Sequence, residues 1–301
     1  MTSSPKIGAS ASAKATDGQS IITSRIGAHV SIAGGIDKAP GRAAEIGCET
    51  FQCFTRSPQG GKAVELTPEL VSNFKKEMKK YGMNSFVIHA PYYINLASLK
   101  PAIRYGSIRV LQEELERGDV LGARYVMAHI GSHSGQTAEE GIDKSSRAIE
   151  KILDGYDGST QLLIEISAGA GSVLGDTFEE IGAIIKHIRT RKGFGGICFD
   201  TCHAFASGYD FRTPSGAKKM MKLFDEMIGL KLLRLTHVND SKFDLDGKHD
   251  RHEHIGRGFI GKEGIASILR TKPFQSIDWI LETEDTDRIK DVEALKKIRS
   301  R

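Results

Sequence analysis

Short apolar runs recur along the chain about every 35 to 45 residues, and each ends in a side chain that can bind a metal ion. The runs are SFVIH, YVMAH, QLLIE, GICFD, LLRLTH and DWILE. Their final residues are His89, His129, Glu165, Asp200, His237 and Glu282. A strand buried on both faces reads as such a run, and about 40 residues hold one strand, one helix and two loops. The pattern predicts parallel strands with a potential ligand at each carboxyl end.

Two runs further upstream complete a set of eight predicted strands. RIGAH ends at His29 and TFQCF ends at Phe54, at comparable spacing. Eight alternating strand and helix units over residues 25–301 match the (β/α)8 TIM barrel, which typically has about 250 residues and an active site at the carboxyl ends of its strands. The periodicity therefore predicts a single-domain α/β barrel with a metal site at that face.

The segment after the second strand shows how clearly a helix between strands can be recognised. Thr67 and Pro68 provide an N-cap and a proline at the first helical position, and Gly82 provides a stop. Apolar residues at helical spacing follow the cap at Leu70, Phe74 and Met78. The sequence predicts one amphipathic helix here.

Residues 1–24 differ from the rest of the chain in composition. They are rich in Ser, Ala, Thr and Gly and show no apolar periodicity, so a disordered tail is expected before the barrel domain of residues 25–301. No run approaches the roughly 18 apolar residues of a membrane span, and no signal-peptide pattern is present. We expect an intracellular, cytoplasmic monomer that is neither secreted nor associated with a membrane.

The four cysteines contain no CxxC pair, which argues against a disulfide framework or a thiolate metal site. Cys202 lies between Asp200 and His203, but oxygen and nitrogen ligands are already abundant there, so a small buried thiol is expected.

Charge alone says little about partners, because 42 Lys and Arg nearly balance 38 Asp and Glu, for a net charge of +4. Three bound divalent ions would add six charges and bring the total to about +10, concentrated at the barrel mouth. Such a mouth would attract phosphate.

The potential ligands exceed what one metal needs. Besides the six strand ends, the chain contains Asp200-x-x-His203 and, in a polar loop, Asp250-Arg251-His252. Residues two apart on an extended loop point the same way, which leaves Arg251 on the opposite side or toward substrate. Nine residues suffice for three ions if one carboxylate bridges two of them, and clustered ions suit phosphodiester hydrolysis. Burying so many unpaired polar groups without metal would cost several kcal/mol each.

These residues lie in segments that together resemble a known family. The segments are GAHVSIAGG, HAPYYINLAS, HIGSH, EISAGAGSVLG, DTCHAFASGYD, HVNDSK, DRHEHIGRGFIG and ILET. In this order, from about Ile26 to Thr283, they resemble the endonuclease IV family of apurinic/apyrimidinic (AP) endonucleases.

The resemblance implies a DNA repair hydrolase that cuts the phosphodiester bond 5′ to abasic sites in double-stranded DNA. It implies a 3′-hydroxyl and a 5′-deoxyribose phosphate as products, a three-zinc mechanism with metal-bound hydroxide as nucleophile, and some 3′ end-trimming. Ligand types suit zinc, with Mn²⁺ or Fe²⁺ as substitutes.

The resemblance also assigns the ligands. The first zinc would be held by His89, His129 and Glu165. Glu165 would bridge to the second, completed by Asp200, His237 and Glu282. The third would be held by His203, Asp250 and His252. Glu165, His203 and Glu282 are the residues we assign to catalysis.

Recognition of DNA is expected from the loops. Tyr92 matches a tyrosine that the family places at the DNA, and Arg56, Lys62 and Arg251 are candidates for phosphate contacts. The chain departs from the family at Gln59–Gly61, where the family usually carries bulky residues, so DNA bending and selectivity are expected to differ more than the chemistry.

Two alternatives remain open on the sequence. A sugar isomerase or epimerase of the related barrel group also uses Glu, Asp and His at strand ends, although it does not need the third site formed by His203, Asp250 and His252. A metal-stabilised DNA-binding barrel without catalysis would fit Gly60 and Gly61, although the ligand set is complete.

Overall fold

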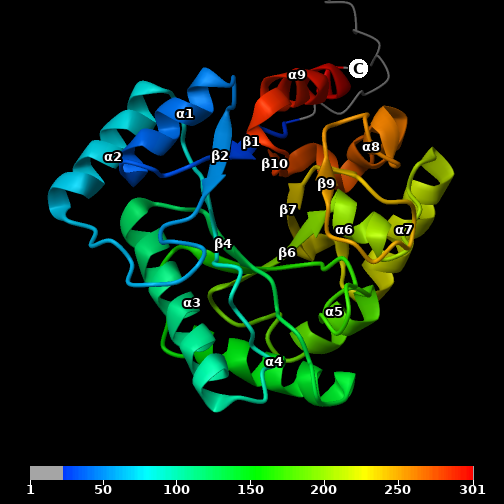
Figure 1. The fold of residues 1–301 in the computed structure, drawn as a ribbon, viewed down its shortest axis with the longest axis horizontal. Helices are drawn as coiled ribbons and strands as arrows, with labels where there is room; N and C mark the ends of the chain where they lie inside the picture. The colour runs from blue at the N-terminus through cyan, green and yellow to red at the C-terminus, as the bar shows by residue number, and fades with distance from the viewer. Residues whose placement is uncertain (1–22, 301) are drawn as a thin grey trace, which may run out of the picture.

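The computed structural model describes residues 23–300, and its centre is a closed barrel of eight parallel strands (Figure 1). Around the barrel the strand order is β1-β10-β7-β6-β5-β4-β3-β2. The strands are β1 (Ile26–His29), β2 (Thr50–Cys53), β3 (Val87–His89), β4 (Tyr125–Ala128), β5 (Gln161–Glu165), β6 (Phe194–Asp200), β7 (Leu233–His237) and β10 (Asp278–Leu281). Each predicted run corresponds to one strand, which confirms the (β/α)8 barrel.

Helices surround the barrel and connect its strands (Figure 1). They are α1 (Ala39–Glu45), α2 (Pro68–Lys80), α3 (Pro101–Leu121), α4 (Ala138–Leu153), α5 (Phe178–Ile185), α6 (Thr201–Ala206), α7 (Pro214–Met227), α8 (Gly261–Leu269) and α9 (Arg288–Arg299). Short 3₁₀ turns are η1 (Ile36–Lys38), η2 (Leu230–Leu232), η3 (Lys272–Ser276) and η4 (Asp285–Asp287). A small hairpin, β8 (Asp240–Ser241) and β9 (His252–Glu253), follows β7. Among residues 23–300, no helix is long and apolar enough to cross a membrane.

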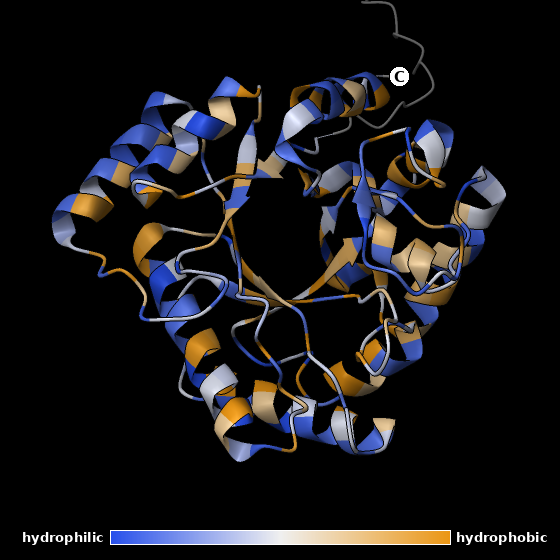
Figure 2. Ribbon diagram, in the orientation of Figure 1, coloured by the Kyte–Doolittle hydropathy of each residue, from blue (hydrophilic) through white to orange (hydrophobic). Residues whose placement is uncertain are grey.

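The helix predicted after the second strand is α2, and its ends are those that the sequence indicated. The Thr67 hydroxyl accepts a hydrogen bond from the Leu70 amide at 3.2 Å, Phe74 and Met78 are buried, and Gly82 follows with a φ of +67°. Figure 2 shows hydrophilic and hydrophobic bands alternating along the outer helices, as expected for helices with one face on the barrel.

Side chains on the strands alternate between two hydrophobic layers. One layer packs between strands and helices and includes Ile164. The other fills the barrel interior and includes Leu163, the residue before it. The interior layer consists of Val87, Tyr125, Met127, Leu163, Cys198, Leu235 and Ile280. Because strand side chains have a period of two, the residue two positions beyond an interior residue also faces the barrel axis.

The barrel domain begins earlier than the sequence suggested. The Thr23 amide donates to the Gln275 carbonyl at 2.9 Å, and the buried Ser24 hydroxyl donates to the Phe274 carbonyl at 2.8 Å. The expected tail of residues 1–24 was therefore wrong at its last two residues, and the remainder, residues 1–22, lies outside the residues that the structure describes.

Candidate metal centre

Six strands each place a potential ligand at the mouth of the barrel, two residues after an interior apolar side chain. The pairs are Val87 and His89, Met127 and His129, Leu163 and Glu165, Cys198 and Asp200, Leu235 and His237, and Ile280 and Glu282. The apolar member fixes which face each strand turns inward, so the polar member must face the axis as well. The convergence of the six follows from this period and from closure of the barrel.

Two groups of histidine and carboxylate ligand atoms share Glu165. The first comprises His89, His129 and Glu165, and the second comprises Glu165, Asp200, His237 and Glu282; within each group the ligand atoms lie within 4.8 Å of one another. His129 Nε2 is 3.3 Å from Glu165 Oε2, whereas His237 Nδ1 is 2.8 Å from Glu165 Oε1. The two carboxylate oxygens of Glu165 therefore face different groups, as a bridging ligand requires.

A third group forms beside the second. Asp200 caps α6 and accepts from the His203 amide at 2.9 Å, which turns the His203 ring over the same rim. Ligand atoms of Asp200, His203 and His252 lie within 4.8 Å of one another. Asp250 Oδ1 lies 3.1 Å from His203 Nε2 and 3.3 Å from His252 Nε2. The structure thus brings together the nine residues singled out in the sequence, with Asp250 at the exposed edge.

Hydrogen bonds orient the imidazoles. Nδ1 of His89 bonds to the Ala90 carbonyl at 2.5 Å, and Nδ1 of His203 bonds to the Ile166 carbonyl at 2.9 Å. A ring whose Nδ1–H donates to a carbonyl presents the Nε2 lone pair to a metal, which is the usual arrangement in metal sites.

His237 is turned the other way. Its Nε2–H donates to Gln52 Oε1 at 2.8 Å, and its Nδ1 faces Glu165 and Glu282, at 2.8 Å and 3.1 Å from their carboxylate oxygens. Nδ1 is therefore the nitrogen available to a metal in the second group.

Three buried atoms at the centre lack a hydrogen-bond partner. Among residues 23–300, four buried side-chain nitrogen or oxygen atoms have none: Ser145 Oγ, Glu165 Oε2, His203 Nε2 and His252 Nε2. The last three belong to the ligand groups, and His203 Nε2 approaches Asp250 without the angles of a hydrogen bond. Leaving such atoms unpaired is costly, so the donor set fits divalent metal ions.

The electrostatics of the groups favour cations. Burial by itself would lower the pKa of His203, but the carboxylates of Asp200 and Asp250 outweigh burial and raise it well above its usual value. Burial would raise the pKa of Glu165, but His237 and His129 hold it well below its usual value. The carboxylates thus attract positive charge, and a bound metal ion would take the place of the imidazole protons.

Two side chains that sequence reasoning did not assign hold the ligands in place. Gln52 donates to Glu282 Oε1 at 2.6 Å while accepting from His237. Asn239 Nδ2 donates to Asp200 Oδ2 at 2.7 Å, and its side-chain oxygen Oδ1 accepts from the Glu282 amide at 2.9 Å. In the sequence, Gln52 could have been noticed as an amide inside the apolar run TFQCF, and Asn239 as an amide two residues after His237.

Two cysteines lie near the centre. Cys198 lies in the interior layer beside Glu165 and His237, and burial raises the pKa of its thiol to about 12. Burial likewise raises the pKa of Cys202 to about 12. All four cysteines are buried and free, which agrees with the expectation that Cys202 is a small buried thiol.

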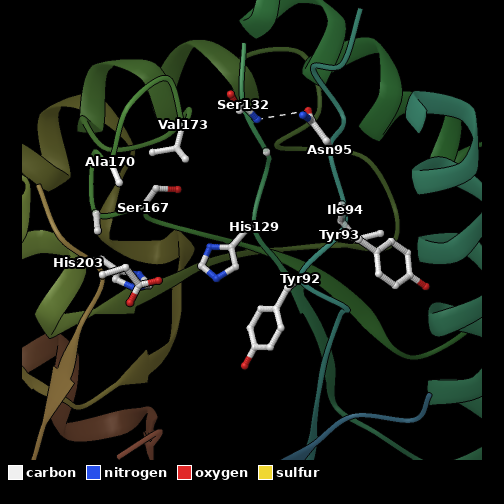
Figure 3. Close-up of a pocket in the computed structure, with 13 residues that line it drawn as sticks. Tyr92, Tyr93, Ile94, Asn95, His129, Ser132, Ser167, Ala170, Val173 and His203 are labelled. Carbon is white, nitrogen blue, oxygen red and sulfur yellow. Dashed lines mark hydrogen bonds and ion pairs between the residues drawn. The ribbon is translucent and has the colours of Figure 1, made fainter. Parts of the chain in front are cut away.

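A pocket of about 430 Å³ opens beside the first and third groups, lined by His129, His203 and Asp250 among others. Figure 3 shows the Tyr92 ring beside His129; Tyr93 also lines the pocket, with its ring turned away from His129. The Tyr92 side chain is 66% exposed, and its ring packs at 5.3 Å from His89. The exposed Tyr92 ring therefore lies next to His89, one of the potential metal ligands.

Arg56 was wrongly expected to contact phosphate. Its side chain is only 4% exposed, and Nε lies 2.5 Å from Oε1 of the buried Glu114. The guanidinium is paired with Glu113 and Glu114 of α3. Lys62 and Arg251, in contrast, are exposed.

The comparisons with known proteins agree with this geometry. A family model described as "Xylose isomerase-like TIM barrel" matches residues 40–300. A protein named "Probable endonuclease 4" from Halothermothrix orenii is 40% identical over 91% of this chain and 99% of its own.

Solved structures give the same result. Endonuclease IV from Thermus thermophilus has a TM-score of 0.80 and 31% identity, covering 92% of this chain and 98% of that one. A D-tagatose 3-epimerase-like protein has a TM-score of 0.72 at 22% identity, covering 92% and 97%, and at that identity it shows the barrel fold alone. On the extent of these matches, the chain belongs to the endonuclease IV family of AP endonucleases, within the xylose isomerase-like TIM barrels.

Proposed function

We propose that this protein is a DNA repair endonuclease that hydrolyses the phosphodiester bond 5′ to abasic sites in duplex DNA, leaving a 3′-hydroxyl and a 5′-deoxyribose phosphate. The single observation that carries the proposal is the convergence of three ligand groups, linked by shared carboxylates, at one barrel mouth. Relatives named endonuclease 4 that match almost the full length of the chain support the choice of DNA as substrate.

The residues fit three zinc ions in the arrangement that the sequence suggested. His89, His129 and Glu165 would hold the first ion. Glu165 would bridge to the second, with Asp200, His237 and Glu282. The third would be held by His203, Asp250 and His252. When bound, such ions polarise a phosphoryl oxygen and lower the pKa of water to about 7, so that no side-chain nucleophile is needed.

The protein's own residues would position the groups around the reacting phosphate. Glu165, with its two oxygens in different groups, sets the separation of the first two sites. Glu282 is fixed through Gln52 and Asn239, and His203 is fixed through the Ile166 carbonyl. Rigid ligands of this kind keep the site in one geometry before DNA arrives, which lowers the cost of reorganisation during the reaction.

Contacts with DNA are proposed for exposed residues at the mouth. The Tyr92 ring is placed to fill stacking space left by a missing base, and Lys62 and Arg251 could neutralise phosphates. Gly60 and Gly61, with φ of +114° and +97°, offer no side chain to enter the duplex. We therefore expect selectivity for abasic sites to depend on Tyr92 more than on the loop after β2.

Several properties remain predictions. These are the zinc content and its replacement by Mn²⁺ or Fe²⁺, 3′ end-trimming, the monomeric state, and an intracellular location. A sugar isomerase reaction is the alternative function, and the third group of His203, Asp250 and His252 argues against it, because that reaction does not need a third metal.

The decisive experiment is incision of an end-labelled duplex that carries one abasic analogue. We expect the zinc-loaded wild type to cut 5′ to the lesion and to leave an undamaged duplex intact. An Asp250→Ala, His252→Ala double variant should lose the activity together with about one metal per chain. A Lys219→Ala variant, altered at an exposed site on α7, serves as the control. An intact lesion duplex after treatment with fully metal-loaded wild type would overturn the proposal.

A further inference from the structure

The loop that joins β8 to β9, residues 242–251, contains an unusual backbone. Asp246 and Lys248 have φ of +61° and +56°, and among residues 23–300 they are the only residues other than glycine with positive φ. Residues other than glycine rarely adopt this backbone conformation, because it costs free energy that surrounding contacts must offset. The same loop carries Asp250 and leads into His252.

The two left-handed residues attach the loop to α6. The Asp246 amide donates to the Phe205 carbonyl, and the Lys248 amide donates to the Ala206 carbonyl, each at 3.1 Å. Carbonyls in the last turn of a helix lack partners within that helix. The Phe205 carbonyl also accepts from the Gly208 amide at 3.0 Å, whereas the Ala206 carbonyl is capped by the loop. Since α6 carries His203, these bonds connect the two chain segments that make up the third ligand group.

The Lys248 side chain extends the attachment to neighbouring segments. Its Nζ lies 3.5 Å from Asp176 Oδ2, 3.2 Å from Asp246 Oδ1 and 3.5 Å from the Ser207 carbonyl. Its Cδ lies against Gly169, where an added Cβ would approach to 2.8 Å. Gly169 and Asp176 belong to the segment between β5 and α5, so one lysine links three parts of the mouth.

We propose that Lys248 is a positioning residue for the third metal site. By holding the loop against α6 and the β5–α5 segment, it keeps Asp250 beside His203 and His252. Asp250 otherwise stands at the exposed edge of its group, where no strand fixes it. The inference rests on the part of the proposed function in which these three residues bind a metal. Groups hydrogen-bonded to a ligand typically change metal affinity about 10- to 100-fold when they are replaced. Lys248 acts through the loop rather than on a ligand directly, so the lower end of this range is expected.

The test is metal release from the full-length, zinc-loaded protein into a chromophoric chelator. We expect Lys248→Ala to release about one zinc per chain about 10-fold faster than wild type, with the remaining zinc released at the wild-type rate. Asp176→Asn should behave in the same way, and the double variant should be no faster than either single variant. Lys248→Arg, which keeps a cation within reach of Asp176, should restore most of the slow release.

A second variant separates the side chain from the backbone. Lys248→Gly adopts the left-handed conformation freely, so it keeps the amide bond to Ala206 and removes only the ammonium group and its stem. It should release zinc as fast as Lys248→Ala. Zinc release from Lys248→Gly at the wild-type rate would overturn the inference. Equally faster release of all the zinc ions would also overturn it, because it would indicate general destabilisation.

Incision by the wild type distinguishes this inference from the proposed function. Selective release of one zinc from Lys248→Ala, in a protein that does not cut abasic DNA, would support the positioning role and reject the nuclease. Normal incision by wild type together with unchanged zinc release from Lys248→Ala would support the nuclease and reject the positioning role. Lys219→Ala, which removes an exposed lysine from α7, is the matched control and should release zinc as wild type does.

Discussion

Replacing Arg56 with methionine should destabilise the fold rather than weaken DNA binding. The guanidinium is buried against α3, with Nε 2.5 Å from Glu114 Oε1 and Nη2 2.8 Å from Glu113. The Glu114 side chain is completely buried. Arg56→Met would therefore leave a carboxylate in the interior without its main counter-charge.

The size of the effect follows from what remains around Glu114. Breaking a buried ion pair by removing one partner costs about 3–5 kcal/mol. Glu114 keeps a hydrogen bond from the Thr55 hydroxyl at 2.5 Å, and Arg117 Nε stays 4.0 Å away. These contacts offset part of the loss, so the lower end, about 3 kcal/mol, is expected.

Urea unfolding followed by circular dichroism measures this free energy. The melting temperature should fall by about 5 °C for a loss of about 3 kcal/mol, because the unfolding entropy is about 2.1 cal/mol/K per residue. Adding Glu114→Met to Arg56→Met should recover most of the stability, because replacing both members of a buried pair by apolar residues is often neutral. Arg109→Met is the control, because Arg109 is exposed and forms a weak pair with Glu113 at 3.9 Å. This substitution should change the free energy of unfolding by less than about 1 kcal/mol.

The reasoning would be refuted by an Arg56→Met protein that unfolds as wild type does but binds abasic duplex less tightly. That result would place the guanidinium at the DNA. Failure of Glu114→Met to restore stability would also contradict it, because the lost free energy would then not come from the unpaired carboxylate.

The remaining predictions concern the ligands and one ion pair. Glu165→Ala should lower incision more than an alanine at His129 and should reduce metal content by more than one ion per chain; equal losses in both variants would argue against bridging. Gln52→Ala should leave His237 Nε2–H without its acceptor and weaken zinc binding about 10- to 100-fold, measured by chelator competition; unchanged affinity would show that His237 is held by other contacts. Burial would raise the pKa of Glu49, but hydrogen bonds from Arg299 and a backbone amide hold it below its usual 4.5. Because the folded-state pKa is lowered, this stabilisation is present above pH 4.5 and is lost as pH falls through the folded-state pKa. The stability difference between wild type and Glu49→Gln should therefore shrink on acidification from pH 7, and a difference that grows would contradict the assignment.

The sequence by itself determined the barrel and the residues that enter its mouth. Apolar runs such as QLLIE have the length of a buried strand, and the period of two places Leu163 and Glu165 on the same face. Thr67 and Gly82 mark the ends of α2 because capping depends on bonds a few residues apart. These features are local, so they can be read without knowing which segments meet.

Only the tertiary structure decided which distant side chains share a partner. Arg56 lies in a polar, glycine-containing stretch of sequence that suggests exposure, but packing of α3 brings Glu114 to it and buries both. Gln52 reaches Glu282 and His237 only because closure of the barrel sets β2, β7 and β10 around one mouth. Lys248 meets Asp176 because the loop after β8 folds back over α6. Such contacts depend on how whole helices and strands pack against one another, and on polar side chains exchanging water for specific protein partners. The pattern of apolar and polar residues along a short segment encodes neither.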